Sequence, residues 1–200
     1  GDAANLSIGQ GTLLVTPLQV AHMMSGVANG YLPRLQLIKQ IQDGNANVVY
    51  APKPQEVQRP LPAYERALSS VRKGMREVVE AGTGGRARLS YSSIAGKSGT
   101  AQWGPEREDK RLAWFAGFMP CDNPRFAYVV LYEALAHERL GGGAAAAPIV
   151  KEFFETEKKD IRAIIDPPKD DIPVAEPVEE TPETAAAALR ERSGAPAVVP

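Results

Sequence analysis

The sequence is poor in the side chains that build metal and redox sites. Its 200 residues include one cysteine, Cys121, and two histidines, His22 and His137. One cysteine cannot form an internal disulfide, and these three residues at their spacings do not make a zinc ligand set. We therefore expect no metal and no cofactor. We interpret both histidines as packed or exposed side chains rather than catalytic ones.

The sequence also lacks a long apolar run and a strong charge of one sign. No segment approaches the roughly 20 consecutive apolar residues that a membrane-spanning helix needs. The formal net charge of -1 gives no electrostatic reason to expect nucleic acid as a partner. A hydrophobic content of 44% over 200 residues is enough for the core of one globular domain.

Large apolar residues are scarce near the C-terminal end. The segment from Pro167 to Pro200 holds seven acidic and three basic residues, seven of the chain's 17 prolines and a run of alanines. Such a composition cannot offset the entropy cost of ordering the chain. We predict a folded region over residues 1–165 and a disordered Pro/Glu/Ala-rich tail over 166–200, with a short helix at most over Ala185–Arg192.

Local signals predict three helices in the folded region. Thr16-Pro17-Leu18-Gln19 combines an N-cap threonine, a proline at the first helical position and a capping-box glutamine, and the helix should end at Asn29-Gly30. Apolar spacing predicts the other helices over Tyr64–Glu80 and Ala145–Ile164. Between the first two helices we expect a hairpin of Arg34–Ile41 and Val48–Tyr50 around Asp43-Gly44, then an irregular connection over Pro52–Pro62.

Three apolar segments separated by turn residues predict an antiparallel meander. The expected strands are Ile94–Gln102, Leu112–Met119 and Phe126–Glu133. Trp114-Phe115 is interpreted as core rather than as a stacking platform, since its strand alternates poorly and resembles one buried on both faces. With the last helix packed on this sheet, the fold class is α+β.

The segment Lys97-Ser98-Gly99-Thr100-Ala101-Gln102 places an ammonium, two hydroxyls and an amide in one predicted strand. A regular pleat puts Ser98, Thr100 and Gln102 on one face and Lys97 on the other. Gly99 has no Cβ, so a substrate or another backbone can approach closely there. The strand is therefore a candidate site for an anion, in particular a carboxylate.

Two simpler interpretations of this segment have to be weighed. Ala95-Gly96-Lys97-Ser98 resembles the end of a phosphate-binding loop, but that motif needs a glycine where Tyr91 stands and a helix afterwards. Gly104-Pro105 makes such a helix unexpected. A solvated edge strand without function is the other alternative.

A second candidate motif is Ser70-Val71-Arg72-Lys73, which satisfies the S-x-x-K pattern of a serine nucleophile with its base. We reject it because the predicted helix carries Ser70 and Lys73 on its polar side. The apolar residues that define the opposite side are Tyr64, Leu68, Val71, Met75 and Val78.

Several short blocks of the sequence have to be considered together: Gly1-Asp2, Leu6–Gly11, Thr16–Gln19, Ala28–Gly30, Gly82–Gly84, Lys97–Gln102, Trp114–Phe118, Gly141–Gly143 and Ala147-Pro148. They resemble the C-terminal part of the transpeptidase domain of class B penicillin-binding proteins, most closely the elongation-type penicillin-binding protein 2. The resemblance covers residues 1–165. Penicillin-recognising serine enzymes carry three signatures, S-x-x-K, an S-D-N-like motif and K-T-G, and Lys97-Ser98-Gly99 matches the third.

The resemblance implies a peptidoglycan D,D-transpeptidase that acts through a serine acyl-enzyme and binds β-lactams. It implies that Lys97 and Thr100 are catalytic and that Ser98, Gly99, Thr100 and Gln102 bind the D-Ala-D-Ala stem peptide. Trp103 is a candidate wall of the groove. The family also implies the periplasmic face of the cytoplasmic membrane, an N-terminal anchoring helix and a membrane-embedded glycosyltransferase partner.

The family's nucleophile and S-x-N motifs precede the first of these blocks and do not occur in this chain at the matching positions, so we interpret the chain as a fragment that is inactive alone. Two alternatives remain: a D,D-carboxypeptidase or β-lactamase-like hydrolase, and a non-catalytic binding module of the same fold. The loop Gly82-Thr83-Gly84-Gly85 is either a simple helix stop or a loop of the substrate groove.

Overall fold

The computed structural model describes residues 5, 9, 11, 13–51, 59–60 and 65–167, with backbone alone at 59, 60 and 106. The sequence block before residue 13 lies almost wholly outside the described residues. So do most of the connection after residue 51 and the predicted tail from residue 168 onward. The boundary between folded region and tail therefore stays a prediction.

Helix α2, Pro17–Asn29, confirms the prediction from its capping residues. Thr16 Oγ1 accepts a hydrogen bond from the Gln19 backbone N–H at 3.3 Å, and Gln19 Oε1 accepts one from Thr16 N–H at 2.8 Å. At the other end Gly30 adopts a left-handed conformation, with φ 81°. Both ends are thus defined by residues within one turn of the helix.

The segment after α2 differs from the prediction. A hairpin does form, with β2 at Ile41–Gln42 and β3 at Val48–Tyr50, and Asp43 Oδ1 accepts from the backbone of the turn. The strand expected over Arg34–Ile41 is wrong except at its last residue. The connection expected to be irregular contains β4, Arg59–Pro60, which pairs antiparallel with β1, Tyr31–Leu32. That pairing joins segments too far apart for local turn signals to predict.

Helix α3, Glu65–Glu80, buries Leu68, Met75 and Val79. The expected apolar side was partly wrong, because Val71 is 48% exposed and Val79 rather than Val78 is fully buried. The helix therefore packs with its contact side shifted by about one residue near its C-terminal end. A 3-10 turn, η1, follows at Gly85–Ala87.

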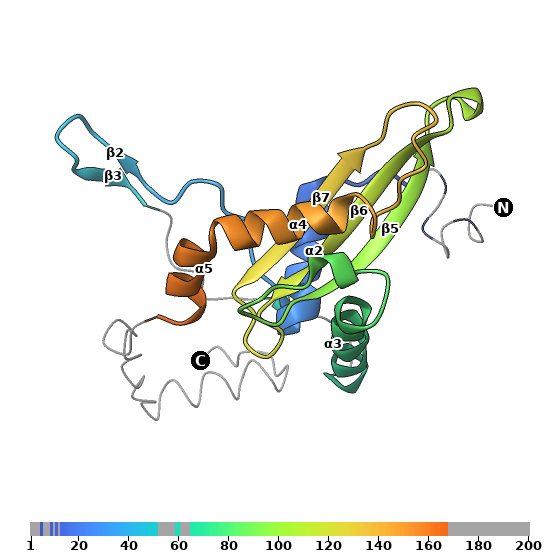
Figure 1. Cartoon of the computed structure of the whole chain (residues 1–200). Coiled ribbons are helices and arrows are strands. Elements are labelled where there is room, and N and C mark those ends of the chain that lie inside the picture. Colours follow the sequence, from blue (N-terminus) through green and yellow to red (C-terminus); the bar gives the residue numbers. More distant parts are fainter. Residues whose placement is uncertain are drawn as a thin grey trace, which may run out of the picture. The chain divides into compact units, whose positions relative to one another are not determined.

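The meander is confirmed as three antiparallel strands in the order β5-β6-β7 (Figure 1). They are β5 at Ala95–Trp103, β6 at Lys110–Met119 and β7 at Phe126–Glu133, with η2, Glu106–Glu108, between the first two. Phe115 is completely buried, as expected for a core strand, whereas Trp114 is only half-buried.

Helices cover both faces of this sheet. On one face, Phe115 and Met119 pack with Val150 and Phe154 of α4, Ala146–Thr156. On the other face, Ala116 and Phe118 pack with residues of α2. We call these the α4 face and the α2 face. The α+β arrangement agrees with the predicted fold class.

The helix expected over Ala145–Ile164 is two helices. Helix α4 ends at Thr156, and α5 runs over Lys158–Ile165 in a new direction (Figure 1). The change occurs at Glu157, whose φ of -87° and ψ of 16° leave the helical range. Ile161 and Ile165 of α5 belong to the same core cluster as Phe154 of α4. Among the described residues, no helix is both long and apolar enough to cross a bilayer.

Candidate functional site

Strand β5 presents different side chains to the two faces of the sheet. Ser98 is opposite Phe115, which belongs to the α4 face, whereas Lys97 is opposite Ala116, which belongs to the α2 face. The strand therefore has the predicted pleat. The two hydroxyl residues of the motif and its ammonium residue lie on opposite sides of the strand.

An open groove of about 610 Å³ lies along the hydroxyl side of β5. We call it the hydroxyl groove. Three segments that are distant in sequence form it: the loop after α3, the centre of β5, and the residues just before α4. Its lining consists of Gly82, Thr83, Gly85, Arg86, Ser98, Thr100 and residues 141–144.

Hydroxyl groups from two of these segments meet in the groove. Thr83 Oγ1 lies 2.9 Å from Ser98 Oγ, and either oxygen can donate the hydrogen bond. The Gly142 backbone N–H donates to Thr100 Oγ1 at 3.4 Å. The loop at Gly82–Gly85 thus lines the hydroxyl groove as well as ending α3, and its contact with a substrate stays a prediction.

Residues 141–143, which we call the glycine strap, pass very close to the backbone of β5. A Cβ atom on Gly142 would lie 2.7 Å from Gly99 O and 2.9 Å from Gly99 N, and nearer still to Trp114 O. A Cβ on Gly99 itself would meet only Trp114 Cβ, at 3.4 Å. The close approach that was expected at Gly99 is therefore made by the backbone of the glycine strap. It is possible because Gly142 has no side chain, and the absence of a side chain at Gly99 matters less.

The other predicted site residues do not line the hydroxyl groove. Lys97 is exposed, and its Nζ donates to the carbonyl oxygen of Ser98 at 2.7 Å. Gln102 and Trp103 lie farther along β5. Lys110 Nζ sits 5.1 Å from the centre of the Trp103 ring, a cation-π contact at a side chain that is 38% exposed.

Arg86 and the strap line the groove, although the sequence analysis did not include them among the site residues. The Arg86 Nη1 donates to Ala144 O at 3.3 Å, across 58 residues of sequence. A lone arginine after a glycine-rich loop carries no local pattern that identifies a site. The run Gly141-Gly142-Gly143 was a usable signal, because three successive glycines often mark a close approach of backbone.

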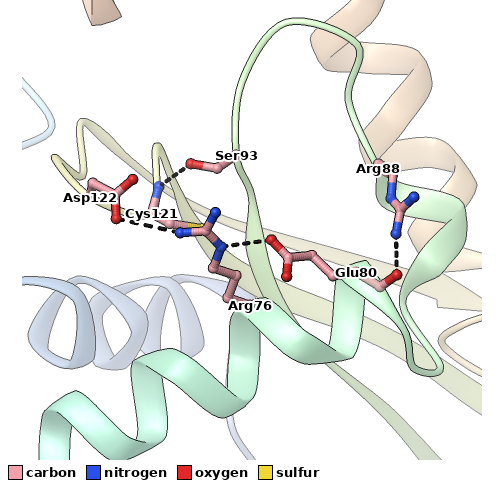
Figure 2. Close-up of polar contacts among 6 residues, drawn as sticks. All are labelled: Arg76, Glu80, Arg88, Ser93, Cys121 and Asp122. Carbon is pink, nitrogen blue, oxygen red and sulfur yellow. Dashed lines mark hydrogen bonds and ion pairs between the residues drawn. The ribbon is translucent and has the colours of Figure 1, made fainter.

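A second polar region braces the end of α3 (Figure 2). Arg76 donates to Glu80 Oε1 at 2.7 Å and lies 3.5 Å from Asp122 Oδ1 in the β6–β7 turn. The Cys121 N–H donates to Ser93 Oγ at 3.0 Å. These contacts connect α3, the β6–β7 turn and the segment before β5, and so hold both ends of the loop that carries Thr83.

A cavity of about 420 Å³ adjoins this region, lined by Val79, Glu80, Arg88, Ser92, Ser93 and Ile94. Arg88 donates to the carbonyl oxygen of Glu80 at the end of α3 (Figure 2). Burial is the main cause that raises the pKa of the nearby Cys121 thiol, which keeps it in its neutral, unreactive form.

The rejected motifs lie where the sequence analysis expected them. Ser70 is exposed on α3, and its hydroxyl donates to Arg66 O at 3.1 Å. Lys73 is exposed as well. His22 Nε2 lies 2.6 Å from Pro33 O, and His137 is exposed in a turn. Among the residues that the structure describes, no three His, Cys, Asp or Glu side chains are grouped to hold a metal ion.

Comparison with known proteins identifies a family for this chain. Residues 2–155 match the penicillin binding protein transpeptidase domain family. The peptidoglycan D,D-transpeptidase MrdA of Haemophilus influenzae is 31% identical over 172 residues, which are 78% of this chain and 25% of that protein. The penicillin-binding protein PbpB of Mycolicibacterium smegmatis is 33% identical over 161 residues, 75% of this chain and 25% of that protein.

A solved structure shows the same likeness in three dimensions. The crystal structure of PBP2 of Pseudomonas aeruginosa in complex with WCK 5153 matches with a TM-score of 0.58 and 32% identity, over 78% of this chain and 32% of that one. The chain thus spans about a quarter of the length of the two curated relatives. The family match covers more than half of the chain. The chain therefore belongs to the penicillin-binding protein transpeptidase domain family, with relatives among the PBP2-type enzymes.

Proposed function

We propose that this chain is the substrate-binding part of a peptidoglycan D,D-transpeptidase. The observation that carries the proposal is the hydroxyl groove beside the K-S-G-T strand, within a chain of this family. The reaction is acyl transfer. A serine attacks the carbonyl of a D-Ala-D-Ala stem peptide, the terminal D-Ala leaves as an amine, and the amine of a neighbouring stem then takes the acyl group from the serine.

In this proposal the hydroxyls of Ser98 and Thr100 bind the terminal carboxylate of the acyl donor. Their position in one groove with Thr83 supports this role, because several converging hydroxyl donors satisfy a carboxylate that has left water. Gly99 lies between these two residues and is proposed to contact the substrate through its backbone, and Gln102 contributes a polar contact farther along the strand. Trp103 is proposed as an outer wall on the same strand.

Lys97 and Thr100 are the proposed catalytic residues of this chain. The Lys97 ammonium supplies positive potential and helps proton transfer to the leaving amine. The Thr100 backbone N–H forms half of the oxyanion hole, and the N–H of the nucleophile forms the other half. Among the described residues, β5 is an edge strand of the sheet. An edge strand has a free side, and this supports the proposal that the nucleophile lies beside β5.

The nucleophilic serine, its lysine and the S-x-N motif belong to the rest of the protein in this proposal. The whole protein would be anchored by an N-terminal helix at the periplasmic face of the cytoplasmic membrane. There it would work with a membrane-embedded glycosyltransferase in wall elongation and cell-shape maintenance. Cell fractionation, with detection of the protein by antibody, tests the location.

The decisive test is acylation of the whole protein by a fluorescent penicillin. We expect a stable adduct in the wild type. Lys97→Ala should slow acylation by about a hundredfold or more, the usual effect of removing a positioned acid–base group. Arg107→Gln, at an exposed position outside the groove, serves as the control. Absence of any adduct would leave the binding-module alternative, and rapid turnover of the adduct would indicate a hydrolase.

The isolated chain should form no penicillin adduct, because Ser70 is exposed on α3 and its hydroxyl is bonded to the helix backbone. Intact-mass analysis after incubation with benzylpenicillin checks this. An adduct that disappears in Ser70→Ala would show that the S-x-x-K match on α3 is a real nucleophile.

A further inference from the structure

Arg86 is the charged residue of the hydroxyl groove. The other lining residues are glycines, an alanine, two threonines and a serine, all uncharged. Lys97, the cation of the sequence motif, lies on the opposite side of β5 and donates to a backbone carbonyl. Within the described groove, the one fixed charge is therefore positive and comes from η1.

The backbone that carries Arg86 is held by the core. Ala87, the next residue, is completely buried in the core of the α4 face, and its N–H donates to Gly84 O at 2.8 Å. The Arg86 side chain extends to Ala144 O, at the far wall of the groove. A short turn anchored by the buried Ala87 thus holds a long cationic side chain along the opening.

The contacts of Arg86 leave its charge uncompensated. Ala144 O, to which it donates, is a neutral acceptor, and the ion pairs of the described residues do not include Arg86. A guanidinium carries five N–H donors in a planar fork that suits a carboxylate. One bond to a carbonyl leaves most of that capacity for a ligand.

Hydroxyls and a guanidinium in one groove without a carboxylate form a lining that suits an anion. We infer that Arg86 binds the ligand carboxylate in the hydroxyl groove, together with the hydroxyls of Ser98 and Thr100, and so makes the site selective for peptides and β-lactams with a free carboxylate. This inference rests on the proposed function and assigns the charge recognition to a residue outside the K-S-G-T motif.

The test compares a carboxylate with its neutral form. In the whole protein, the rate of acylation is measured for benzylpenicillin and for its methyl ester, by competition with a fluorescent penicillin. Arg86→Gln should slow the reaction with benzylpenicillin about tenfold, as expected for loss of a charge-assisted hydrogen bond, and leave the reaction with the ester unchanged. Arg86→Lys keeps the charge but not the planar fork of donors. Its rate of acylation by benzylpenicillin should lie between those of the wild type and Arg86→Gln.

Arg88→Gln is the matched control. It removes the same charge two residues away, from a side chain that lines the other cavity and bonds the end of α3. It should leave the preference for the carboxylate intact. If Arg86→Gln leaves that preference intact as well, or if both variants lower it equally, Arg86 has no specific role and the inference is overturned.

A different result would show that the proposed function, and not the Arg86 inference, is wrong. If the wild-type protein forms no adduct with either compound, the transpeptidase proposal falls, and the Arg86 inference is decided on this chain by NMR titration with N-acetyl-D-Ala-D-Ala and its C-terminal amide. Shifts at Ser98 and Thr100 that appear with the carboxylate and weaken in Arg86→Gln support it. Shifts that are equal for acid and amide, unaffected by Arg86→Gln, or absent overturn it.

Discussion

The two faces of the β5-β6-β7 sheet differ, because one is covered by an apolar core and the other carries a polar groove as well as a core. The α2 face is a closed apolar core, in which Ala95, Ala116 and Phe118 of the sheet pack with Met24 and Ala28 of α2. The α4 face has large aromatic side chains at one end and the hydroxyl groove at the other. Strand β5, like β6, places alternate residues on the two faces. Its alternating residues therefore let a rigid core on one side support a polar groove on the other.

The aromatic packing is what connects the α4 face to the groove. The rings of Phe115 and Tyr128 stack with centres 6.2 Å apart, and Tyr128 meets Phe154 of α4 edge-on at 5.6 Å. Gly84 and Gly96 both lie against the Phe115 ring, where an added Cβ would come within 2.8 and 2.6 Å. The loop bearing Thr83 thus rests directly on this cluster.

The largest expected effect is that of Phe115→Ala. Removal of this fully buried ring should lower the free energy of unfolding by about 3–5 kcal/mol and loosen the loop at residues 82–84. Urea unfolding and hydrogen exchange of that loop measure the two effects. Met24→Ala on the α2 face should also destabilise the fold, by about 2–5 kcal/mol. Equal loosening of the loop in both variants would contradict a special link between the α4 face and the groove.

A smaller but more local effect is expected from Gly142→Ala. The new methyl group would collide with backbone atoms of Gly99 and Trp114, which cannot rotate away. We expect a loss of about 1–3 kcal/mol in unfolding free energy, or displacement of the glycine strap from Thr100. Gly74→Ala is the control, because no atom lies within 4 Å of its added Cβ and alanine is the better helix former. A Gly142→Ala protein as stable as the control, with its strap in place, would refute the packing described here.

The contact of α4 with the segment before β5 should depend on pH. The Ser90 backbone N–H donates to Glu155 Oε1 at 2.7 Å, and this bond is the main cause that lowers the pKa of Glu155. Because the folded-state pKa is depressed, the stabilisation is present above the ordinary glutamate pKa of about 4.3 and is lost as the pH falls through the lower folded value.

Glu155→Gln should therefore lower the melting temperature near neutrality, change it little below the folded pKa of Glu155, and so flatten its dependence on pH in that acidic range. Thermal melts from pH 3 to pH 7, with Glu152→Gln on the same helix as control, measure this. A parallel loss of stability at all pH values would assign Glu155 a packing role instead.

The smallest effect is expected from Arg76→Ala. Its ion pairs with Glu80 and Asp122 lie in contact with water, where such pairs contribute little to stability. The melting temperature should change little, and the hydroxyl groove should keep its ligand preference. A large decrease in melting temperature would mean that the ion pairs in Figure 2 stabilise the end of α3 more than expected for pairs in contact with water.

Much of the fold could be predicted because its signals are local. Thr16, Gln19 and Gly30 define α2 within a few residues of one another. The run Phe126–Glu133 coincides with β7, since an apolar segment between turn residues is a local pattern. The break at Glu157 was missed because Phe154, Ile161 and Ile165 recur at helical spacing and lie in one core cluster, so the apolar pattern predicts one continuous helix.

The groove was predicted only in part, for a similar physical reason. Alternation along β5 follows from the pleat of any strand, so the shared side of Ser98 and Thr100 could be derived in advance. The partners of those hydroxyls could not, because Gly142 lies 42 residues from Thr100 and Ala144 lies 58 residues from Arg86.

The sequence by itself therefore determined the family, the three main strands, the capped helix α2 and which residues of the K-S-G-T strand share a side. The tertiary structure alone decided which segments close over that strand, that Gly142 rather than Gly99 provides the close approach, and that Arg86 is the cation of the groove. Short-range hydrogen bonds and side-chain periodicity act within a few residues and can be read in order along the chain. A groove made of three distant segments depends on packing, which only the folded chain brings about.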